Sequence, residues 1–169
     1  MMIPVERNFL ELRDLKNLKL NSIKQTKFIV KKIRPDFQLN KFFYKQVGKK
    51  HRWIDRLSWS DEKWINFTSN KNLETYVISE TEDLVGFFEL LHNPELKETE
   101  ISYFGLLEEY IGKGIGGYAL SEAIKKSFER DIKRVWLHTC TLDHPNALKN
   151  YIARGMTVFK RENIKILDN

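Results

Sequence analysis

Cysteine is almost absent from this chain, because Cys140 is the only one among its 169 residues. A disulfide bond within the chain is therefore impossible, and we expect a reducing, cytoplasmic location. Long apolar runs are absent too, since none approaches the roughly 18 residues that a membrane-spanning helix needs. Residues 1–7 lack a basic region followed by an apolar core, so they do not predict a signal peptide. We therefore expect no membrane association.

The sequence also lacks internal repeats, low-complexity segments and linkers rich in proline, glycine or serine. Typical domains have about 100–200 residues, so the sequence predicts one domain over residues 1–169. Within this domain, residues 1–25 are expected to form an N-terminal extension that packs on the rest.

Charge is distributed unevenly along the chain. Residues 16–56 hold 13 lysines and arginines against two aspartates, whereas residues 57–112 hold three lysines against 12 acidic residues. The basic part could bind nucleic acid, but its lysines are scattered rather than grouped with aromatic residues, which favours a solvated surface. We therefore do not expect nucleic acid as a partner. The acidic part, if it lined a cleft, would attract a cationic substrate such as an amine.

Hydrophobic periodicity and turn residues predict a mixed order of strands and helices. Strands are predicted at 7–13, 26–33, 74–79, 84–91, 100–107, 134–138 and 156–160. Helices are predicted over 36–47, from Ser60 onward, from a glycine-rich turn at 112–117 to about Asp131, and over 145–154. Trp64, Ile65 and Phe67 are expected to form the buried side of the second helix. Short connections between the strands at 74–107 favour antiparallel pairing.

Four glycines lie within the six residues Gly112–Gly117, the glycine loop, between a predicted strand and a predicted helix. Glycine lets backbone N–H groups approach a ligand, and the helix start adds the positive end of a dipole, so the loop favours phosphate or pyrophosphate. The loop also satisfies G-x-G-x-x-G. A dinucleotide site would need an acid about 20 residues on, where Trp136–Thr139 offer none. No G-x-x-x-x-G-K-[ST] is present, which excludes a P-loop.

The segment Glu108–Gly117 resembles motif A of the GNAT superfamily, the pyrophosphate-binding pattern R/Q-x-x-G-x-G/A. Gly114 and Gly116 stand at its two small positions. Ile111 stands where the motif has arginine or glutamine. This departure removes one side-chain contact but leaves the backbone N–H groups.

The segment Asn146–Met156 resembles motif B, N-x-x-A-x-x-x-Y-x-x-x-G-F, because Ala147, Tyr151 and Gly155 match in register. Met156 replaces the phenylalanine. The segment His-Thr-Cys-Thr-Leu-Asp-His-Pro at 138–145 is similar to a bacterial GNAT subgroup that has no assigned substrate.

The resemblance implies an α/β (α+β) fold: a mixed, largely antiparallel sheet with a splay after the strand at 100–107, and helices on both faces. It implies direct transfer of an acetyl group from acetyl-CoA to a primary amine in a ternary complex, with no metal. The acceptor would be a small molecule or a protein, and the chain could form a homodimer. The alternative is a non-catalytic acyl-CoA-binding sensor, which an intact glutamate and tyrosine pair would disfavour.

By this resemblance the pyrophosphate would bind the backbone N–H groups of the glycine loop, and pantetheine would pair with the strand around 104–106. The thioester oxygen needs donors as it gains charge, and the N–H groups of Leu106 and Leu107 are the candidates. The predicted cofactor-binding residues are Phe104, Gly105, Leu106, Leu107, Gly112, Lys113, Gly114, Ile115, Gly116 and Gly117.

The reaction also needs a base for the amine and an acid for the leaving thiolate. Glu89 interrupts an apolar run, where an acid is costly unless paired or functional, although it could instead face solvent at an edge. Glu100 matches a glutamate base in several relatives, but it could simply begin its strand. Tyr151 matches the tyrosine acid, with a core aromatic as the alternative. His144 could relay protons or serve a turn.

The predicted acceptor site lies between the first two helices, where this fold usually binds its acceptor. It consists of Trp53, Asp55, Arg56 and Trp59. Aromatic rings together with an acid suit a cation. The alternative is a packed tryptophan cluster.

Overall fold

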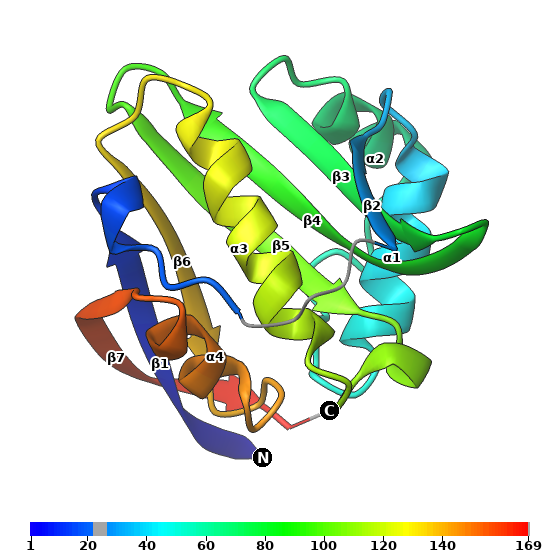
Figure 1. The fold of residues 1–169 in the computed structure, drawn as a ribbon. Helices are drawn as coiled ribbons and strands as arrows, with labels where there is room; N and C mark the ends of the chain where they lie inside the picture. Colours follow the sequence, from blue (N-terminus) through cyan, green and yellow to red (C-terminus); the bar gives the residue numbers. More distant parts are fainter. Residues whose placement is uncertain (22–26, 169) are drawn as a thin grey trace.

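The computed structural model describes residues 1–21 and 27–168. Within these residues seven strands form one sheet, in the order β2-β3-β4-β5-β6-β1-β7 (Figure 1). The strands are β1 (Met2–Leu12), β2 (Phe28–Lys32), β3 (Leu73–Glu80), β4 (Asp83–Asn93), β5 (Glu98–Leu106), β6 (Arg134–Cys140) and β7 (Thr157–Leu167). The helices are α1 (Phe37–Gly48), α2 (Asp61–Thr68), α3 (Ile115–Phe128) and α4 (Ala147–Ala153), with short 3-10 helices at Leu15–Asn17 and Glu108–Tyr110.

The strands pair antiparallel everywhere except between β5 and β6. These two run parallel, and they pair only where Glu98–Glu100 lie beside Arg134–Trp136. Beyond this short stretch β5 and β6 separate. The predicted mixed, largely antiparallel sheet with a splay after the strand at 100–107 is therefore confirmed.

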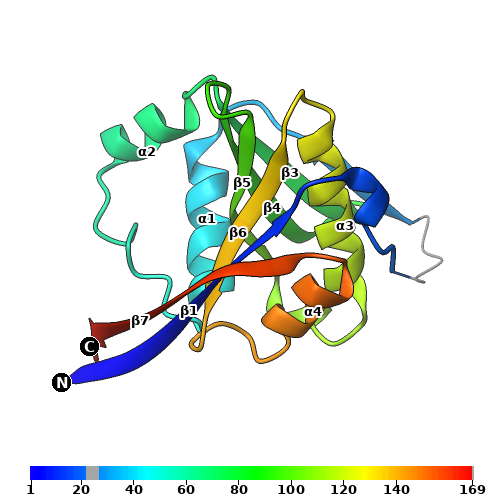
Figure 2. The same cartoon turned by 90° about the vertical axis from the view of Figure 1, so that its left-hand side faces the viewer.

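Helices cover both faces of the sheet, as predicted (Figure 2). On one face α1 buries Phe43 and Val47 against Phe87 of β4, and the Phe43 and Phe87 rings stack at 4.9 Å. On the other face α3 packs Leu120 and Ile124 into a larger core, to which α4 also contributes. The larger core includes residues of both β5 and β6, the strands on either side of the splay.

The predicted element boundaries differ from the structure mainly in the terminal strands. β1 is longer than expected and lies between β6 and β7, so residues 2–12 are part of the sheet rather than an extension packed on it. β7 continues to Leu167 because it pairs along most of β1. Thr26, the expected start of the second strand, lies outside the described residues. In α2 Trp64 is buried, but Ile65 is 44% exposed, which corrects its predicted burial.

None of the helices in the described part of the chain is both long and apolar enough to cross a membrane.

Candidate active site

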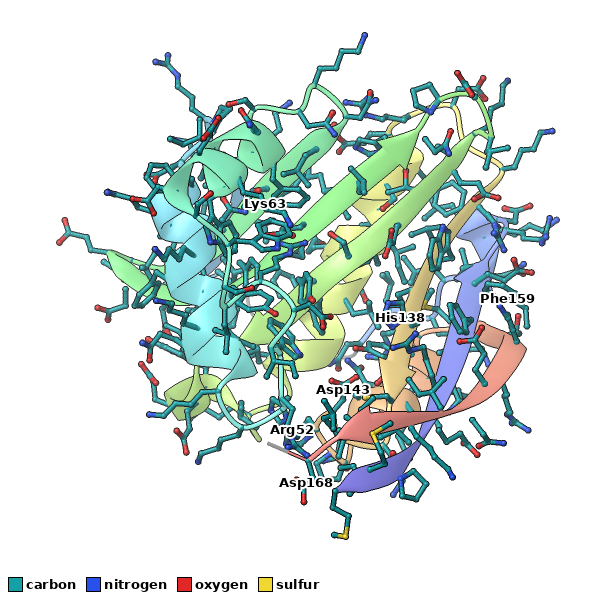
Figure 3. All side chains as sticks on the ribbon, turned by 180° about the vertical axis from the view of Figure 1, so that it is seen from behind. Arg52, Lys63, His138, Asp143, Phe159 and Asp168 are labelled. Atoms are coloured by element: carbon teal, nitrogen blue, oxygen red, sulfur yellow. The ribbon has the colours of Figure 1, made fainter. Side chains whose placement is uncertain are left out.

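A cleft of about 540 Å³ opens where β5 and β6 separate. Its walls come from β1, β5, β6, β7, the glycine loop, α4, and the segment 51–55 between α1 and α2. Figure 3 shows the sheet from behind, with the cleft-lining residues Arg52, His138 and Asp143 labelled. One cavity therefore reaches both the predicted phosphate loop and part of the predicted acceptor site.

The glycine loop leads directly into the first turn of α3. Gly112 and Gly114 have φ angles of 80° and 77°, a left-handed conformation that favours glycine. Gly114 is the N-cap of α3 and offers no side-chain cap, so the first N–H groups of the helix remain available. The side-chain amide of Asn21 donates to the Gly114 carbonyl at 2.8 Å and fixes the loop. This arrangement suits an anion at the positive end of the helix dipole.

The edge of β5 presents backbone groups to the cleft. The Leu107 N–H donates to the Val85 carbonyl at 2.8 Å, so it points toward β4. Successive N–H groups of an extended strand point to opposite sides, and the Leu106 N–H therefore points into the splay. The Leu107 N–H, one of the two predicted oxyanion donors, therefore already has a partner in β4. Leu106 remains a prediction that the geometry allows.

Most of the other predicted cofactor-binding residues line the cleft, namely Phe104, Gly105, Leu106, Gly112, Gly114, Gly116 and Gly117. Two residues of the glycine loop do not. Ile115 is 3% exposed and belongs to the core beneath α3. The ammonium of Lys113 lies 5.5 Å from the centre of the Tyr110 ring. The loop therefore offers backbone N–H groups to the cleft, while these two side chains are turned elsewhere.

Tyr151 lies on α4 and is 8% exposed. Its ring is 6.4 Å from that of Phe104, and both side chains line the cleft. Burial raises the pKa of the Tyr151 phenol above its ordinary value, and the nearby Asp143 carboxylate raises it further. The hydroxyl is therefore protonated at neutral pH, the form that an acid requires.

Two histidines meet across the cleft. His144 and His51 have ring centres 5.9 Å apart, and the His144 Nδ1 accepts a hydrogen bond from the Asn146 N–H at 3.1 Å. Asp143 lies beside them, held by the Thr139 hydroxyl at 2.5 Å and the Cys140 N–H at 3.0 Å. Burial lowers the pKa of His51 below its ordinary value, His144 adds to this effect, and Asp143 opposes it. His51 is therefore neutral at pH 7.

Glu89 is fully buried on β4. Its carboxylate accepts two hydrogen bonds from Arg56 Nη1, at 2.9 and 3.1 Å, one from Asn40 at 2.9 Å and one from Ser102 at 3.3 Å. Glu89 does not line the cleft. The alternative of a solvated edge residue is therefore wrong, because the side chain is fully buried and Arg56 compensates its charge. The role of Glu89 as base stays a prediction.

Arg56 is also enclosed by aromatic rings. Its guanidinium lies 4.2–5.6 Å from the ring centres of Tyr44, Trp59, Trp64, Phe67 and Tyr103. Neither Arg56 nor Trp59 lines the cleft, and the Trp59 ring packs on Arg56, Trp64 and Phe67. Their role as substrate contacts stays a prediction. Trp53 and Asp55, by contrast, do line it.

Glu100 lines a second cavity of about 700 Å³, together with His92 and Trp136. Burial raises the pKa of its carboxyl group; Glu89 adds to this effect, and Arg56 opposes it. The structure does not bring Glu100 into the cleft that holds Tyr151. Within the described residues, no group of three or more His, Cys, Asp or Glu side chains is arranged to hold a metal ion.

Sequence reasoning missed Asn21, His51 and Arg154, which all line the cleft. Arg154 follows Tyr151 by three residues, so helical spacing alone could have indicated it. Asn21 is 93 residues from Gly114, and no local pattern connects the two. His51 precedes Trp53 by two residues but carries no motif.

A sequence model of the acetyltransferase (GNAT) family matches residues 34–156. The comparison with curated proteins gave no match. Among solved structures, a GCN5-related N-acetyltransferase from Sphaerobacter thermophilus has a TM-score of 0.68 and 17% identity, covering 97% of this chain and 51% of that one. The GCN5-related N-acetyltransferase from Kribbella flavida has a TM-score of 0.65 and 14% identity, covering 93% and 56%.

An aminoglycoside acetyltransferase from an uncultured soil metagenomic sample has a TM-score of 0.63 and 12% identity, covering 77% of this chain and 88% of that one. The chain thus spans only slightly more than half the length of the Sphaerobacter and Kribbella proteins. At such identities these structures establish a shared fold. The match of the family model over 34–156, which contains the glycine loop and Tyr151, establishes more: the chain belongs to the acetyltransferase (GNAT) family.

Proposed function

We propose that this protein is an N-acetyltransferase that moves an acetyl group from acetyl-CoA to a primary amine by direct attack in a ternary complex. Membership of the acetyltransferase (GNAT) family supports acyl transfer in general. The observation that carries the finer proposal is the single cleft, which joins the glycine loop to Trp53 and Asp55 and passes Tyr151 on the way.

The donor would lie along the β5 side of the cleft. Its pyrophosphate would accept hydrogen bonds from the first N–H groups of α3, and its pantetheine would follow the edge of β5 at Phe104–Leu106. The Leu106 N–H would donate to the thioester oxygen as that oxygen gains negative charge.

The amine would approach from the segment 51–55. The ring of Trp53 and the exposed carboxylate of Asp55 suit a cation, whereas the neighbouring Arg52 is paired with Asp168 at 2.9 Å. The amine nitrogen would attack the thioester carbon, the carbon–sulfur bond would break, and the thiolate would take a proton from the Tyr151 hydroxyl.

A base must take the proton that the amine loses. Because Glu89 and Glu100 lie outside the cleft, we assign this role to His51, whose ring is neutral at pH 7 and lines the acceptor end. His144 is 5.9 Å away and would pass the proton toward solvent. The acceptor remains a small-molecule or protein amine.

A panel of amines tested with acetyl-CoA would examine the proposal. Free thiol release is measured with a thiol reagent, and the acetylated amine is identified by mass spectrometry. We expect release in equal amount to acetylated product for at least one amine. Binding of acetyl-CoA without turnover for any amine would favour the sensor, and the absence of both binding and turnover would exclude either function.

A further inference from the structure

Arg154 lies where α4 meets the first turn of α3, and α4 is beside the start of α3 in both views (Figures 1 and 2). Its backbone is fixed on both sides: its N–H donates to the Asn150 carbonyl at 3.0 Å, and its carbonyl accepts from the Lys19 N–H at 2.9 Å. Its guanidinium packs so closely on α3 that a methyl group added to Gly117 would overlap Nη1. Arg154 also lines the cleft.

The charge of Arg154 is not compensated by any acidic side chain that the structure describes. Across residues 1–21 and 27–168 no acidic side chain forms an ion pair with it, and its Nε is buried without a hydrogen-bond partner. A buried N–H donor without a hydrogen-bond partner is unfavourable. The Arg154 guanidinium also lies at the start of α3, which is the positive end of the helix dipole and favours anions over cations. Two positive features therefore converge on one point of the cleft.

The glycine loop itself lacks a cation directed at this point. Ile111 occupies the position where the motif has arginine or glutamine, and it lines the cleft with 37% exposure. Lys113 lies against Tyr110 instead. Only Arg154 therefore brings a positive side chain to the start of α3 among the cleft residues of the loop and of α4.

We propose that Arg154 binds the pyrophosphate of the CoA donor. Its guanidinium would replace the arginine or glutamine side chain that the motif has at the position of Ile111. The pyrophosphate would then be held by backbone N–H groups from α3 and by a guanidinium from α4. An anion there would satisfy the buried Nε and neutralise both positive features at once. This inference rests on the proposed function, because it assigns a residue to the donor end of the same cleft.

The test measures the binding of three ligands to wild type and to Arg154→Gln. The ligands are CoA, dephospho-CoA and pantetheine. Dephospho-CoA lacks the 3′-phosphate, and pantetheine lacks every phosphate. A hydrogen bond to a charged group stabilises a complex more than a neutral one does. In Arg154→Gln we therefore expect the affinity for CoA and for dephospho-CoA to fall by roughly 10- to 150-fold. The affinity for pantetheine should not change. The control is Lys149→Gln, which removes the same charge from an exposed position on α4 and should leave all three affinities unchanged. Adding Ile111→Arg to Arg154→Gln should restore binding.

Melting curves without ligand separate binding from a structural role. Because the Arg154 side chain has no ion-pair partner among the described residues and its Nε has no hydrogen-bond partner there, Arg154→Gln should melt at the same temperature as wild type or higher. Equal CoA affinity in wild type and Arg154→Gln would overturn this inference alone. A loss for CoA but not for dephospho-CoA would place the contact on the 3′-phosphate and overturn the pyrophosphate assignment, and a loss for pantetheine would indicate a distorted cleft. If wild type bound no CoA at all, the proposed function would fall with it.

Discussion

The guanidinium of Arg56 and the carboxylate of Glu89 form a doubly hydrogen-bonded ion pair at 2.9 and 3.1 Å, with side-chain exposures of 7% and 0%. The pair connects the segment that follows α1 to the middle of β4. Since Asp55 directly precedes Arg56, this buried contact holds residues 51–55, which line the cleft, against the sheet. Removal of either partner alone would leave an uncompensated buried charge.

We therefore expect Arg56→Met to lower the free energy of unfolding by about 3–5 kcal/mol, the usual cost of breaking a buried pair on one side. The double variant Arg56→Met/Glu89→Met removes both charges and should recover most of that loss, because an apolar pair of similar volume is often neutral. Urea denaturation of the wild type and of the variants, Glu89→Met included, gives the coupling. If the double variant were no more stable than Arg56→Met, the pair would not explain the burial of Glu89.

The start of α3 offers a second test. A side chain added to Gly116 would enter the cleft, since the nearest atom to its added methyl group is Asn150 Nδ2 at 3.7 Å. Gly116→Leu should fold normally but weaken acetyl-CoA binding, because forcing a side chain into occupied space costs about 1–3 kcal/mol, or roughly 5- to 150-fold in Kd. Gly116→Ala adds only the methyl group and should bind nearly as wild type. If calorimetry found the same acetyl-CoA affinity in Gly116→Leu as in wild type, the assignment of the donor site to this loop would be wrong.

Local sequence patterns were enough to predict the glycine loop, the order of its strand and helix, and a tyrosine on the next short helix. These features depend on residues close together in the chain. The direction of the Leu107 N–H could not be predicted, because it depends on strand register, and β5 contains an irregularity opposite Glu89 and Leu90 that the sequence does not reveal.

The role of Glu89 depended on a distant partner. An acid within an apolar strand indicates either a functional group or a buried pair, and only the fold decides between them. Arg56 is 33 residues away in the sequence, on a loop whose conformation cannot be predicted from hydrophobic periodicity. The same limit hid Asn21 and His51, which reach the cleft through chain connections rather than through a motif.

His51 provides a prediction of pH dependence. A base acts when deprotonated, and burial lowers the pKa of His51, so kcat/KM should rise with pH below about 6.5 and level off above it. His51→Gln should reduce kcat/KM by about 10²–10⁴-fold and abolish this acidic limb. The pH profile of His144→Gln is the comparison. A limb retained in His51→Gln but lost in His144→Gln would move the base to His144.

Glu74 on β3 predicts how stability depends on pH. Burial would raise its pKa, but hydrogen bonds from Arg130 at 2.8 Å and Tyr76 at 2.9 Å outweigh this and lower it from 4.5 to about 2. The folded state thus binds fewer protons than the unfolded state, so the stabilisation is present above pH 4.5 and is lost as pH falls toward 2. A shift of this size corresponds to about 3 kcal/mol at most.

Glu74→Gln should therefore be less stable than wild type at pH 7, and its unfolding free energy should fall less steeply between pH 5 and pH 2. Denaturant titrations at several pH values would measure both slopes. Glu95→Gln, which removes the same charge from an exposed position, is the control and should keep the wild-type slope. Equal slopes in Glu74→Gln and wild type would show that other carboxylates cause the acid sensitivity.

Tyr151 separates an enzyme from a sensor. The thiolate leaves during the chemical step, so a proton donated by the phenol would stabilise the transition state more than the bound ground state. Tyr151→Phe removes the hydroxyl and keeps the ring against Phe104, so we expect kcat to fall by about 10²–10⁴-fold with little change in acetyl-CoA affinity or melting temperature. Steady-state kinetics on the best amine, a binding isotherm and a melting curve are needed for both proteins. Normal turnover per folded molecule in Tyr151→Phe would refute the acid role, because the ring would then serve packing alone and the thiolate would take its proton from water or His144.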